Sequence, residues 1–361
     1  MSKKKFTPSK YSKKALEGSV TWKSPSNIAL VKYWGKKPVQ LPANTSISFT
    51  LDTCATTTTL HYRYLEKRAK DFNFKVVFEG ERKKSFEPKV KKFFDNIDGY
   101  FSFLKEYEFT IETSNSFPHS SGIASSASGM SALALCLMSM EEQLVKEKME
   151  SDYFMEKASF IARLGSGSAC RSLKGPMMVW GQNEDINGSS NEYAIKHPHS
   201  IHEVFHNFQD TILLVDKGEK TVSSTVGHDL MHFHPFAKKR FKQAEKNIST
   251  LKGVLKKGDL KAFIRLVESE ALTLHAMMMT SLPYFILMKP NTLEVINKIW
   301  EFRKKTKLHV CFTLDAGANV HVLYPENEKT EVLAFIKEEL AQFCENQQYI
   351  CDQVGKGATK L

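Results

Sequence analysis

One segment limits the possible folds more than any other, because it joins a strand, a small-residue loop and a strongly apolar helix. Phe109–Thr113 alternates aromatic and β-branched residues with polar ones and predicts a strand. The loop that follows is rich in Ser, Pro and Gly. Ala124–Met140 is dense in small and apolar residues, a pattern typical of a helix that is buried on most of its faces. The segment therefore predicts a helix inside a domain core.

The remaining segments mix strands and helices without regular alternation. Residues 20–51 predict short strands broken by turn residues. Strands are expected at Ala29–Trp34, Ser46–Leu51, Thr56–Tyr64, Lys75–Phe78, Phe109–Thr113, Met177–Trp180, Thr211–Val215, His309–Leu314 and His321–Tyr324. Helices are expected at Pro88–Lys105, Ala124–Met140, Tyr153–Leu164, Pro235–Lys257, Leu260–Met279, Asn291–Lys304 and Glu331–Phe343. This order favours an α+β fold over a doubly wound sheet.

The 361 residues are more than one hydrophobic core usually serves, so two lobes are expected. The polar stretch Asn183–Ser200, which contains Asn-Gly and Pro, is the predicted boundary. We expect a disordered basic tail over 1–18, a first lobe over 19–195 and a second lobe over 196–361, with the extreme C-terminus packed back on the first lobe. No apolar run reaches the roughly eighteen residues of a spanning helix, and the basic start lacks the apolar stretch of a secretory signal.

Cysteine usage and charge limit the environment and the partners. The six cysteines show neither CxxC pairs nor zinc-ribbon spacing, which predicts reduced thiols in the cytoplasm. Cys136 and Cys311 lie in apolar runs, where a thiol behaves as a small hydrophobe. The 51 basic and 40 acidic side chains give a net charge of +11. A positive field attracts nucleic acid or small polyanions such as ATP, and solvated lysine-rich faces explain most of these charges equally well.

Two loops of small residues are candidate anion sites. In Phe117–Gly129, small residues let backbone N–H groups approach a phosphate at a helix N-terminus. Ser125 and Ser126 can offer hydroxyls to phosphate or Mg²⁺, although the Gly-Lys-Ser/Thr of a Walker A loop is absent. A tight turn with serine caps is the alternative. In Gly165–Ser172, the planar fork of Arg171 suits a carboxylate or a phosphate, or has a structural role.

Two further segments bring charged side chains to strand ends. In Val31–Lys37, lysines flank an aromatic pair, with Asn27 four residues upstream of Val31. These lysines either bind an anion or cap the end of the strand. Asp315 is followed by Ala-Gly and is either a catalytic base at a strand end or the start of an Asx turn.

Histidine clusters in the second half carry a weaker signal. His202–His206 matches the zinc-protease pattern H-E-x-x-H, which needs a third ligand and an open position. The flanking sequence leaves barely two helical turns, and Gln209 and Ile212 stand where the extended motif has Gly and His. A zinc protease is therefore disfavoured. The histidines of His228–His234 are expected at the surface.

Taken in order, these segments resemble the diphosphomevalonate decarboxylase family, of the superfamily of galactokinase, homoserine kinase, mevalonate kinase and phosphomevalonate kinase. The matching motifs are Asn27–Lys36, Leu41–Leu51, Gly122–Gly129, Gly165–Ser172 and Asp315–Asn319, with a fainter echo at Gln353–Gly355. Each motif is modest alone, but five in order are specific. The resemblance implies a two-lobed α+β small-molecule-kinase fold, with a ribosomal-protein-S5-domain-2-like N-lobe and an α/β-sandwich C-lobe, and an active site in the cleft between them.

The resemblance also implies an activity, ATP- and Mg²⁺-dependent decarboxylation of 5-diphosphomevalonate, and a set of roles. Asp315 matches the base beside the 3-hydroxyl, with Lys32 close to it. Arg171 matches the residue that holds the C1 carboxylate, with Asn27 nearby. The positions that contact the diphosphate end match Tyr33, Lys36, Ser168 and Ser224. The ATP-phosphate loop matches Ser120, Ser121, Gly122, Ser125 and Ser126, and Ser126 is also the candidate Mg²⁺ ligand. A cytoplasmic homodimer without nucleic-acid or membrane partners is implied.

The chain departs from the family pattern at several positions. Ala318 replaces a proline, Lys37-Pro38 replaces Arg-Asp, and Lys174-Gly-Pro replaces an aromatic-Gly-Gly. None of these changes removes a proposed catalytic group, but Lys37, Pro38 and Lys174 bear on the number of phosphates that the substrate carries. A monophosphate decarboxylase and a kinase that stops after phosphorylation are the alternatives within the superfamily. A basic RNA-binding module is the alternative outside it.

Overall fold

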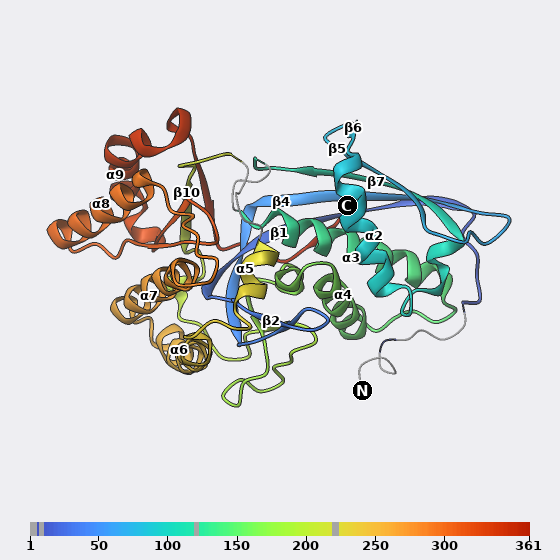
Figure 1. Cartoon of the computed structure of the whole chain (residues 1–361), viewed down its shortest axis with the longest axis horizontal. Helices are drawn as coiled ribbons and strands as arrows, with labels where there is room; N and C mark the ends of the chain where they lie inside the picture. Colours follow the sequence, from blue (N-terminus) through green and yellow to red (C-terminus); the bar gives the residue numbers. More distant parts are fainter. Residues whose placement is uncertain (1–5, 7–10, 119–122, 219–223) are drawn as a thin grey trace.

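Two antiparallel-rich sheets organise the chain. The computed structural model describes residue 6 and residues 11–118, 123–218 and 224–361 (Figure 1). The larger sheet has the strand order β14-β1-β4-β7-β5-β6, with β8 paired to β4 and β9 paired to β8. The smaller sheet has the order β11-β12-β10-β13. Strands β5 and β7 run parallel, whereas the neighbouring pairs β1–β4 and β4–β7 are antiparallel. This mixed topology confirms the α+β prediction.

The elements have the following bounds. The larger sheet contains β1 (Glu17–Val31), β4 (Ser46–Tyr64), β5 (Asn73–Phe78), β6 (Glu81–Arg82), β7 (Tyr107–Asn115), β8 (Met177–Trp180), β9 (Ile195–Lys196) and β14 (Thr359–Lys360). The smaller sheet contains β10 (Gln209–Leu213), β11 (Cys311–Thr313), β12 (Val320–Tyr324) and β13 (Tyr349–Gln353), and a hairpin is formed by β2 (Lys36–Lys37) and β3 (Leu41–Pro42). The helices are α2 (Glu87–Ile97), α3 (Ser125–Leu144), α4 (Ser151–Gly165), α5 (Ser224–Leu230), α6 (Ala237–Lys257), α7 (Leu260–Met279), α8 (Pro290–Thr306) and α9 (Lys329–Phe335).

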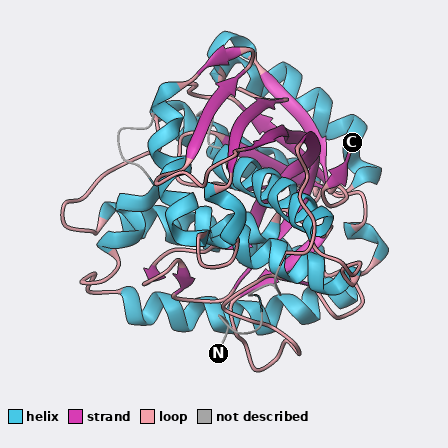
Figure 2. Ribbon diagram, turned by 90° about the vertical axis from the view of Figure 1, so that its right-hand side faces the viewer, coloured by secondary structure: helices cyan, strands magenta, loops and turns pink. Residues whose placement is uncertain are grey.

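Helix α3 is the central helix of the first lobe. It packs against β1, β4 and α4, and the side chains from Ala132 to Met138 are at most 3 % exposed. This confirms the prediction of a helix buried on most sides, since the sheet covers one face and α4 another. The second half of β4 alternates buried and partly exposed residues, as expected for a strand with one covered face. Figure 2 shows the strands in the upper middle of the molecule, with helices around and below them.

The two sheets meet across an apolar junction. From Ser24 to Val31 in β1, and from Ser46 to Leu51 in β4, every residue is buried. One apolar cluster joins these strands to β10, β11, α6 and α7, with members such as Leu30, Phe49 and Ile212. Because both faces of β1 and β4 are covered here, polar side chains on them lie inside the molecule. The other face of the smaller sheet packs against α8 and α9.

Several predicted boundaries were wrong. Residues 20–51 predicted short strands, but β1 runs unbroken from Glu17 to Val31 because register shifts near Pro25 and Ala29 absorb its turn-forming residues as bulges. Strand β4 joins two expected strands into one. Helix α2 ends at Ile97, and Gly99 separates it from a short 3₁₀ turn.

The C-terminal segment crosses from one sheet to the other. Strand β13 pairs with β10 in the smaller sheet, and β14 pairs with β1 in the larger sheet. Between them, the Gly355 N–H donates to the Thr50 carbonyl at 2.7 Å. None of the helices that the structure describes is long and apolar enough to cross a membrane.

Candidate active site

Lys32 and Asp315 form an ion pair between the two lobes. Lys32 follows directly after β1, and Asp315 lies two residues beyond β11. The Lys32 Nζ is 2.9 Å from the Asp315 Oδ1, and the side chains are 2 % and 26 % exposed. The ammonium is thus buried and the carboxylate remains partly open to solvent. The partly open carboxylate has access to a ligand, while the buried ammonium stabilises its charge.

A buried network holds the Lys32 backbone in place. The Lys32 N–H donates to Glu270 Oε2 on α7 at 2.9 Å, and the Lys32 carbonyl accepts from Asn44 Nδ2 at 3.0 Å. Glu270 in turn pairs with Arg240 on α6, and both of these side chains are fully buried. Neither Glu270 nor Arg240 belongs to a motif that identifies it from the sequence. Each is a charged residue within the apolar pattern of a helix. Two such residues indicate a buried ion pair, since charge is rarely buried without a partner.

Arg171 lies in a buried polar cluster beside this pair. It ends the 3₁₀ turn Gly167–Arg171, which follows α4, and is 3 % exposed. Its Nε donates to Asn27 Oδ1 at 3.2 Å, and its Nη1 donates to Ser46 Oγ. Burial lowers the pKa of Arg171, and the negative charge of Asp315 acts in the opposite direction. The guanidinium and the Asp315 carboxylate therefore share one electrostatic environment.

Asn27 ties the 3₁₀ turn to β1. Its Nδ2 donates to the Ser168 carbonyl at 3.2 Å and to Ser172 Oγ at 2.8 Å, while its Oδ1 accepts from Arg171. An amide can donate and accept at once, which suits this position between a carbonyl and a guanidinium. Asn27 thereby fixes the orientation of Arg171.

Tyr33 and Lys36 lie on the turn that follows β1. The Tyr33 ring contacts Trp180, with centroids 4.6 Å apart, and burial raises its pKa. A Cβ added at Gly167 would lie 2.9 Å from the Tyr33 Oη, so the glycine allows the 3₁₀ turn to approach the phenol. Lys36 in β2 has its Nζ 3.5 Å from Asp229 Oδ1 on α5.

For the other residues that are expected to contact phosphate, the structure describes only some of the positions and side chains. Ser168 lies in the 3₁₀ turn and engages Asn27 through its carbonyl. Ser224 is the first residue of α5, and its side chain lies outside the described residues. Ser120, Ser121 and Gly122 also lie outside them.

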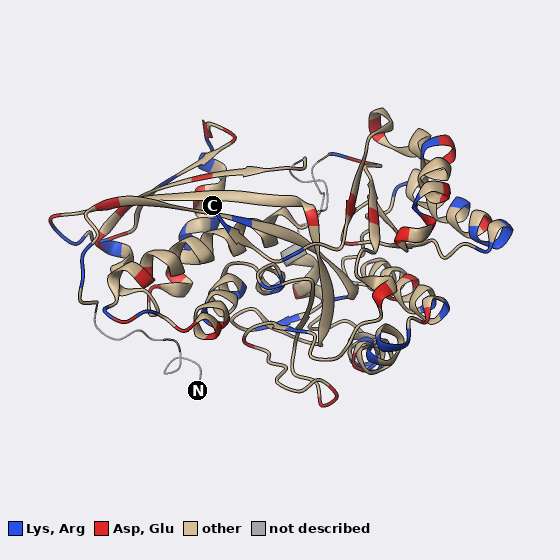
Figure 3. Ribbon diagram, turned by 180° about the vertical axis from the view of Figure 1, so that it is seen from behind, with Lys and Arg blue, Asp and Glu red and all other residues tan. Residues whose placement is uncertain are grey.

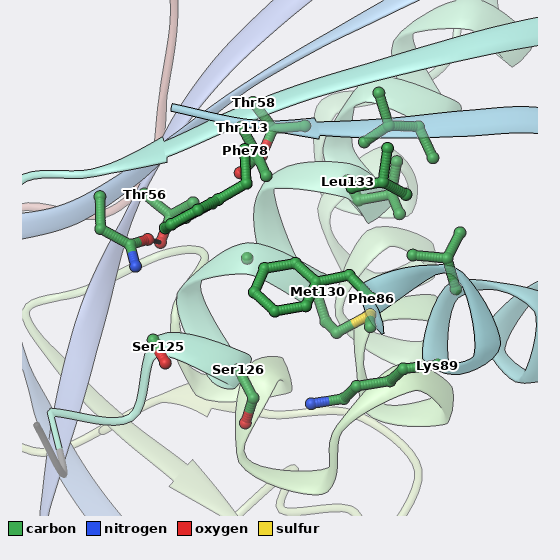
Figure 4. Close-up of a pocket in the computed structure, with 15 residues that line it drawn as sticks. Thr56, Thr58, Phe78, Phe86, Lys89, Thr113, Ser125, Ser126, Met130 and Leu133 are labelled. Atoms are coloured by element: carbon green, nitrogen blue, oxygen red, sulfur yellow. Dashed lines mark hydrogen bonds between the residues drawn. The ribbon is translucent and has the colours of Figure 1, made fainter. Parts of the chain in front are cut away.

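Ser125 and Ser126 begin α3 and line a cavity of about 200 Å³ (Figure 4). The preceding residue, Ala124, has a left-handed backbone with φ of 49°. The Ser126 Oγ is 3.4 Å from Ser166 Oγ, and in Figure 4 the Lys89 side chain extends toward Ser126. The rest of the wall is mostly apolar and comprises Thr56, Thr58, Val76, Phe78, Phe86, Val90, Ile111, Thr113, Asn115, Gly129, Met130 and Leu133.

The predicted surface position of two histidines was wrong. His228 and His234 are 9 % and 7 % exposed, whereas His232 between them is exposed. His228 packs against the rings of Tyr33 and Trp34. The spacing in the sequence could have indicated this position, because His228 lies four residues after Ser224. Residues four apart lie on the same face of a helix.

The zinc-protease pattern forms no two-histidine helix face. Glu203–Phe205 is a 3₁₀ turn, and His202 caps it by accepting the Val204 N–H at 3.2 Å. The His206 Nε2 lies 3.1 Å from the Ile201 carbonyl. In the part of the chain that the structure describes, three His, Cys, Asp or Glu side chains never converge as a metal site would require.

Comparison with known proteins gives a consistent result. A model of diphosphomevalonate decarboxylase-like N-terminal domains matches residues 24–193, and a model of mevalonate 5-diphosphate decarboxylase C-terminal domains matches residues 211–359. A diphosphomevalonate decarboxylase of Debaryomyces hansenii is 30 % identical over 331 residues, which cover 87 % of this chain and 81 % of that protein. The Saccharomyces cerevisiae protein is 28 % identical over 335 residues, covering 87 % and 79 %.

Solved structures agree with these matches. A structure described as MDDEF in complex with MVAPP, AMPPCP and magnesium has a TM-score of 0.80 and 26 % identity, covering 96 % of this chain and 99 % of that one. The mevalonate diphosphate decarboxylase of Staphylococcus aureus has a TM-score of 0.80 and 25 % identity, covering 96 % and 98 %.

Proposed function

The chain belongs to the diphosphomevalonate decarboxylase family, and we propose that Lys32, Asp315 and Arg171 form its catalytic centre. The enzyme catalyses the ATP-dependent decarboxylation of mevalonate diphosphate to isopentenyl diphosphate in the mevalonate pathway. The observation that carries the residue assignment is the Lys32–Asp315 pair, with its 2.9 Å separation and partly open carboxylate.

Asp315 acts as the base in this proposal. The 3-hydroxyl of the substrate is a poor leaving group, so it must first attack the γ-phosphate of ATP. Asp315 accepts the hydroxyl proton as that bond forms, and ADP departs. Phosphate then leaves from C3 while the bond from C2 to the carboxylate breaks. The electron pair of that bond becomes the double bond, and CO₂ is released. Lys32 stabilises the negative charge that Asp315 needs in the first step.

Arg171 holds the C1 carboxylate in the proposed site. A planar guanidinium fits a carboxylate better than an ammonium does, and burial strengthens such a pair. Asn27 and Ser46 fix the guanidinium before the substrate arrives, which limits the entropy lost on binding. The carboxylate is then oriented for the loss of CO₂.

The phosphate end of the substrate is assigned to the turn after β1. Tyr33, Lys36, Ser168 and Ser224 are proposed to contact it. Lys36 supplies a cation, and the 3₁₀ turn that carries Ser168 lies against Tyr33 through Gly167.

ATP and Mg²⁺ are the proposed co-substrate and metal. The cavity beside Ser125 and Ser126 is apolar enough for a base, and its wall includes these first two residues of α3, at a helix N-terminus where phosphates are favoured. Ser120, Ser121 and Gly122 complete the proposed phosphate loop. Ser126 Oγ is an oxygen donor of the kind that Mg²⁺ prefers, and Lys89 adds a cation whose side chain extends toward Ser126. Mg²⁺ would neutralise charge on the phosphates during transfer.

We also propose a cytoplasmic location, small-molecule partners and a homodimeric state for the enzyme. Six unpaired thiols, five of them buried, suit a reducing cytoplasm. Lys and Arg are interleaved with Asp and Glu over the molecule (Figure 3), which suits small anionic ligands better than a nucleic-acid face. A homodimer is proposed from the family resemblance.

One experiment tests the proposed centre through Arg171. ADP and CO₂ release are measured together for the wild type and for Arg171→Lys, with Mg-ATP and mevalonate, 5-phosphomevalonate or 5-diphosphomevalonate. We expect equal ADP and CO₂ from the wild type with the diphosphate, and a loss of turnover of at least roughly 100-fold in the variant because a point charge cannot replace the fork. Normal turnover by Arg171→Lys would contradict the assignment.

A further inference from the structure

Helix α5 presses three consecutive residues against the turn that carries Tyr33 and Lys36. A Cβ added at Gly227 would lie 2.5 Å from the Trp34 ring, so the helix backbone contacts the indole directly. Two residues on, Asp229 Oδ1 is 3.5 Å from Lys36 Nζ. The turn after β1 is therefore held from one side by a separate helix of the other lobe.

His228, between these two residues, makes the closest contacts. Its ring centroid is 4.2 Å from that of Tyr33 and 4.6 Å from that of Trp34. Its Nδ1 is 2.9 Å from the Gly35 backbone nitrogen. Because the Gly35 N–H must donate, Nδ1 must accept, which requires a ring that is unprotonated at Nδ1. The ring is neutral, since burial and the nearby charges of Lys36 and Arg171 lower its pKa to about 3.

We propose that His228 is a positioning residue for the phosphate end of the substrate, holding the Tyr33 ring and the Gly35–Lys36 backbone in their binding geometry. The inference rests on the proposed function, because it takes Tyr33 and Lys36 as phosphate-binding residues. A neutral imidazole suits this position, since it supports a cationic turn without adding a like charge beside Lys36.

Two physical contributions of the ring can be separated. His228→Asn places an amide oxygen near the position of Nδ1 and keeps the acceptor for Gly35, but removes the ring. His228→Phe keeps a ring between Tyr33 and Trp34 but removes the acceptor. His228→Ala removes both contributions.

The test compares KM values for the two substrates in these variants. A hydrogen bond and a ring contact each correspond to roughly a 3- to 10-fold change, so we expect each single loss to raise the KM for 5-diphosphomevalonate by that factor. His228→Ala should raise it roughly 10- to 100-fold. The KM for ATP and the kcat should stay within about 2-fold of the wild type, because the base and the nucleotide site are untouched. His232→Ala, an exposed histidine of the same segment, is the matched control.

Lys36→Ala separates this inference from the function on which it rests. If Lys36→Ala raises the KM for the diphosphate and His228→Ala does not, the inference is overturned and the proposed function stands. If His228→Ala lowers kcat and raises both KM values together, the role is structural and the inference is again overturned. If Lys36→Ala changes nothing, the phosphate-end assignment and the inference both fall.

Discussion

Arg171 and Lys32 keep their charges where little solvent reaches them, and each is held by partners contributed from distant parts of the chain. Arg171 relies on Asn27 and Ser46, and Lys32 relies on Asp315 and, through its backbone, on Glu270. Burying a charge is costly unless it is paired and hydrogen-bonded, so these partners are needed for stability as well as for orientation. The same arrangement suits the carboxylate-binding role that we propose for Arg171.

The burial of His228 leads to a prediction about how the free energy of unfolding depends on pH. Its pKa is about 3 in the folded protein, against about 6.5 in an unfolded chain, so below pH 6.5 the unfolded chain binds more protons. Stability from this ring is therefore complete above about pH 6.5 and is lost as the pH falls toward 3, by about 1.4 kcal/mol per pH unit. Relative to His228→Asn, the wild type should lose about 2 kcal/mol of unfolding free energy between pH 7 and pH 5, measured by urea denaturation. A difference that does not change with pH would contradict the buried neutral ring.

The cavity that we propose for the nucleotide leads to a second prediction. Gly129 on α3 lines the cavity, and a Cβ added there meets only Thr56, at 4.0 Å. Gly129→Leu should therefore place its side chain in the cavity and raise the KM for ATP by roughly 10-fold or more, while the KM for 5-diphosphomevalonate changes little. Both KM values are measured by ADP release.

Gly253→Leu is the matched control for this prediction. Gly253 lies within α6, and a Cβ added there would meet no other heavy atom within 4 Å, so the same substitution in a helix should leave both KM values unchanged. An unaltered KM for ATP in Gly129→Leu would show that the nucleotide binds elsewhere.

At the level of elements, the sequence predicted types better than boundaries. The apolar composition of Ala124–Met140 correctly predicted a buried helix because no other environment suits it. The residues of β1 around Pro25 look like a turn, yet a bulge accommodates them within a long strand, and only the pairing with β4 reveals this. Pairing between strands far apart in sequence cannot be read from local pattern.

The site shows the same division between local and distant information. Motifs identified Arg171 and Asp315 as candidates, since each stands at a recognisable turn. Glu270 and Arg240 belong to no motif, and their burial depends on how α6 and α7 pack against β1. His228 was wrongly predicted at the surface, because its burial depends on how α5 packs against the turn after β1. Residue type and spacing indicate chemistry, whereas burial depends on the whole fold.

At the scale of the whole molecule, strand β13 of the smaller sheet is tied to β4 of the larger sheet through one carboxylate. Asp352 accepts the backbone N–H groups of Asp52, Thr53 and Cys54 at 2.9, 2.9 and 2.7 Å. Hydrogen bonds to a charged acceptor are stronger than neutral ones, so Asp352→Asn should lower the free energy of unfolding by about 2 kcal/mol. Thermal and urea denaturation measure this loss.

A substitution at Asp52, an exposed residue next to Asp352, is the control for the predicted effect of Asp352→Asn on stability. Asp52→Asn changes the same charge on the surface and should shift the unfolding free energy by less than about 0.5 kcal/mol. Equal effects of the two substitutions would mean that net charge, and not the three hydrogen bonds, explains the loss.

The catalytic role of Asp315 is the central claim, and one measurement tests it most directly. CO₂ release by Asp315→Asn is measured with saturating Mg-ATP and 5-diphosphomevalonate, together with the dissociation constant for ATP. We expect turnover to fall by roughly 10²- to 10⁴-fold while ATP affinity stays within about 2-fold, because only the proton acceptor is lost. Turnover close to that of the wild type would remove Asp315 from the mechanism, and with it the account of the Lys32–Asp315 pair as the catalytic centre.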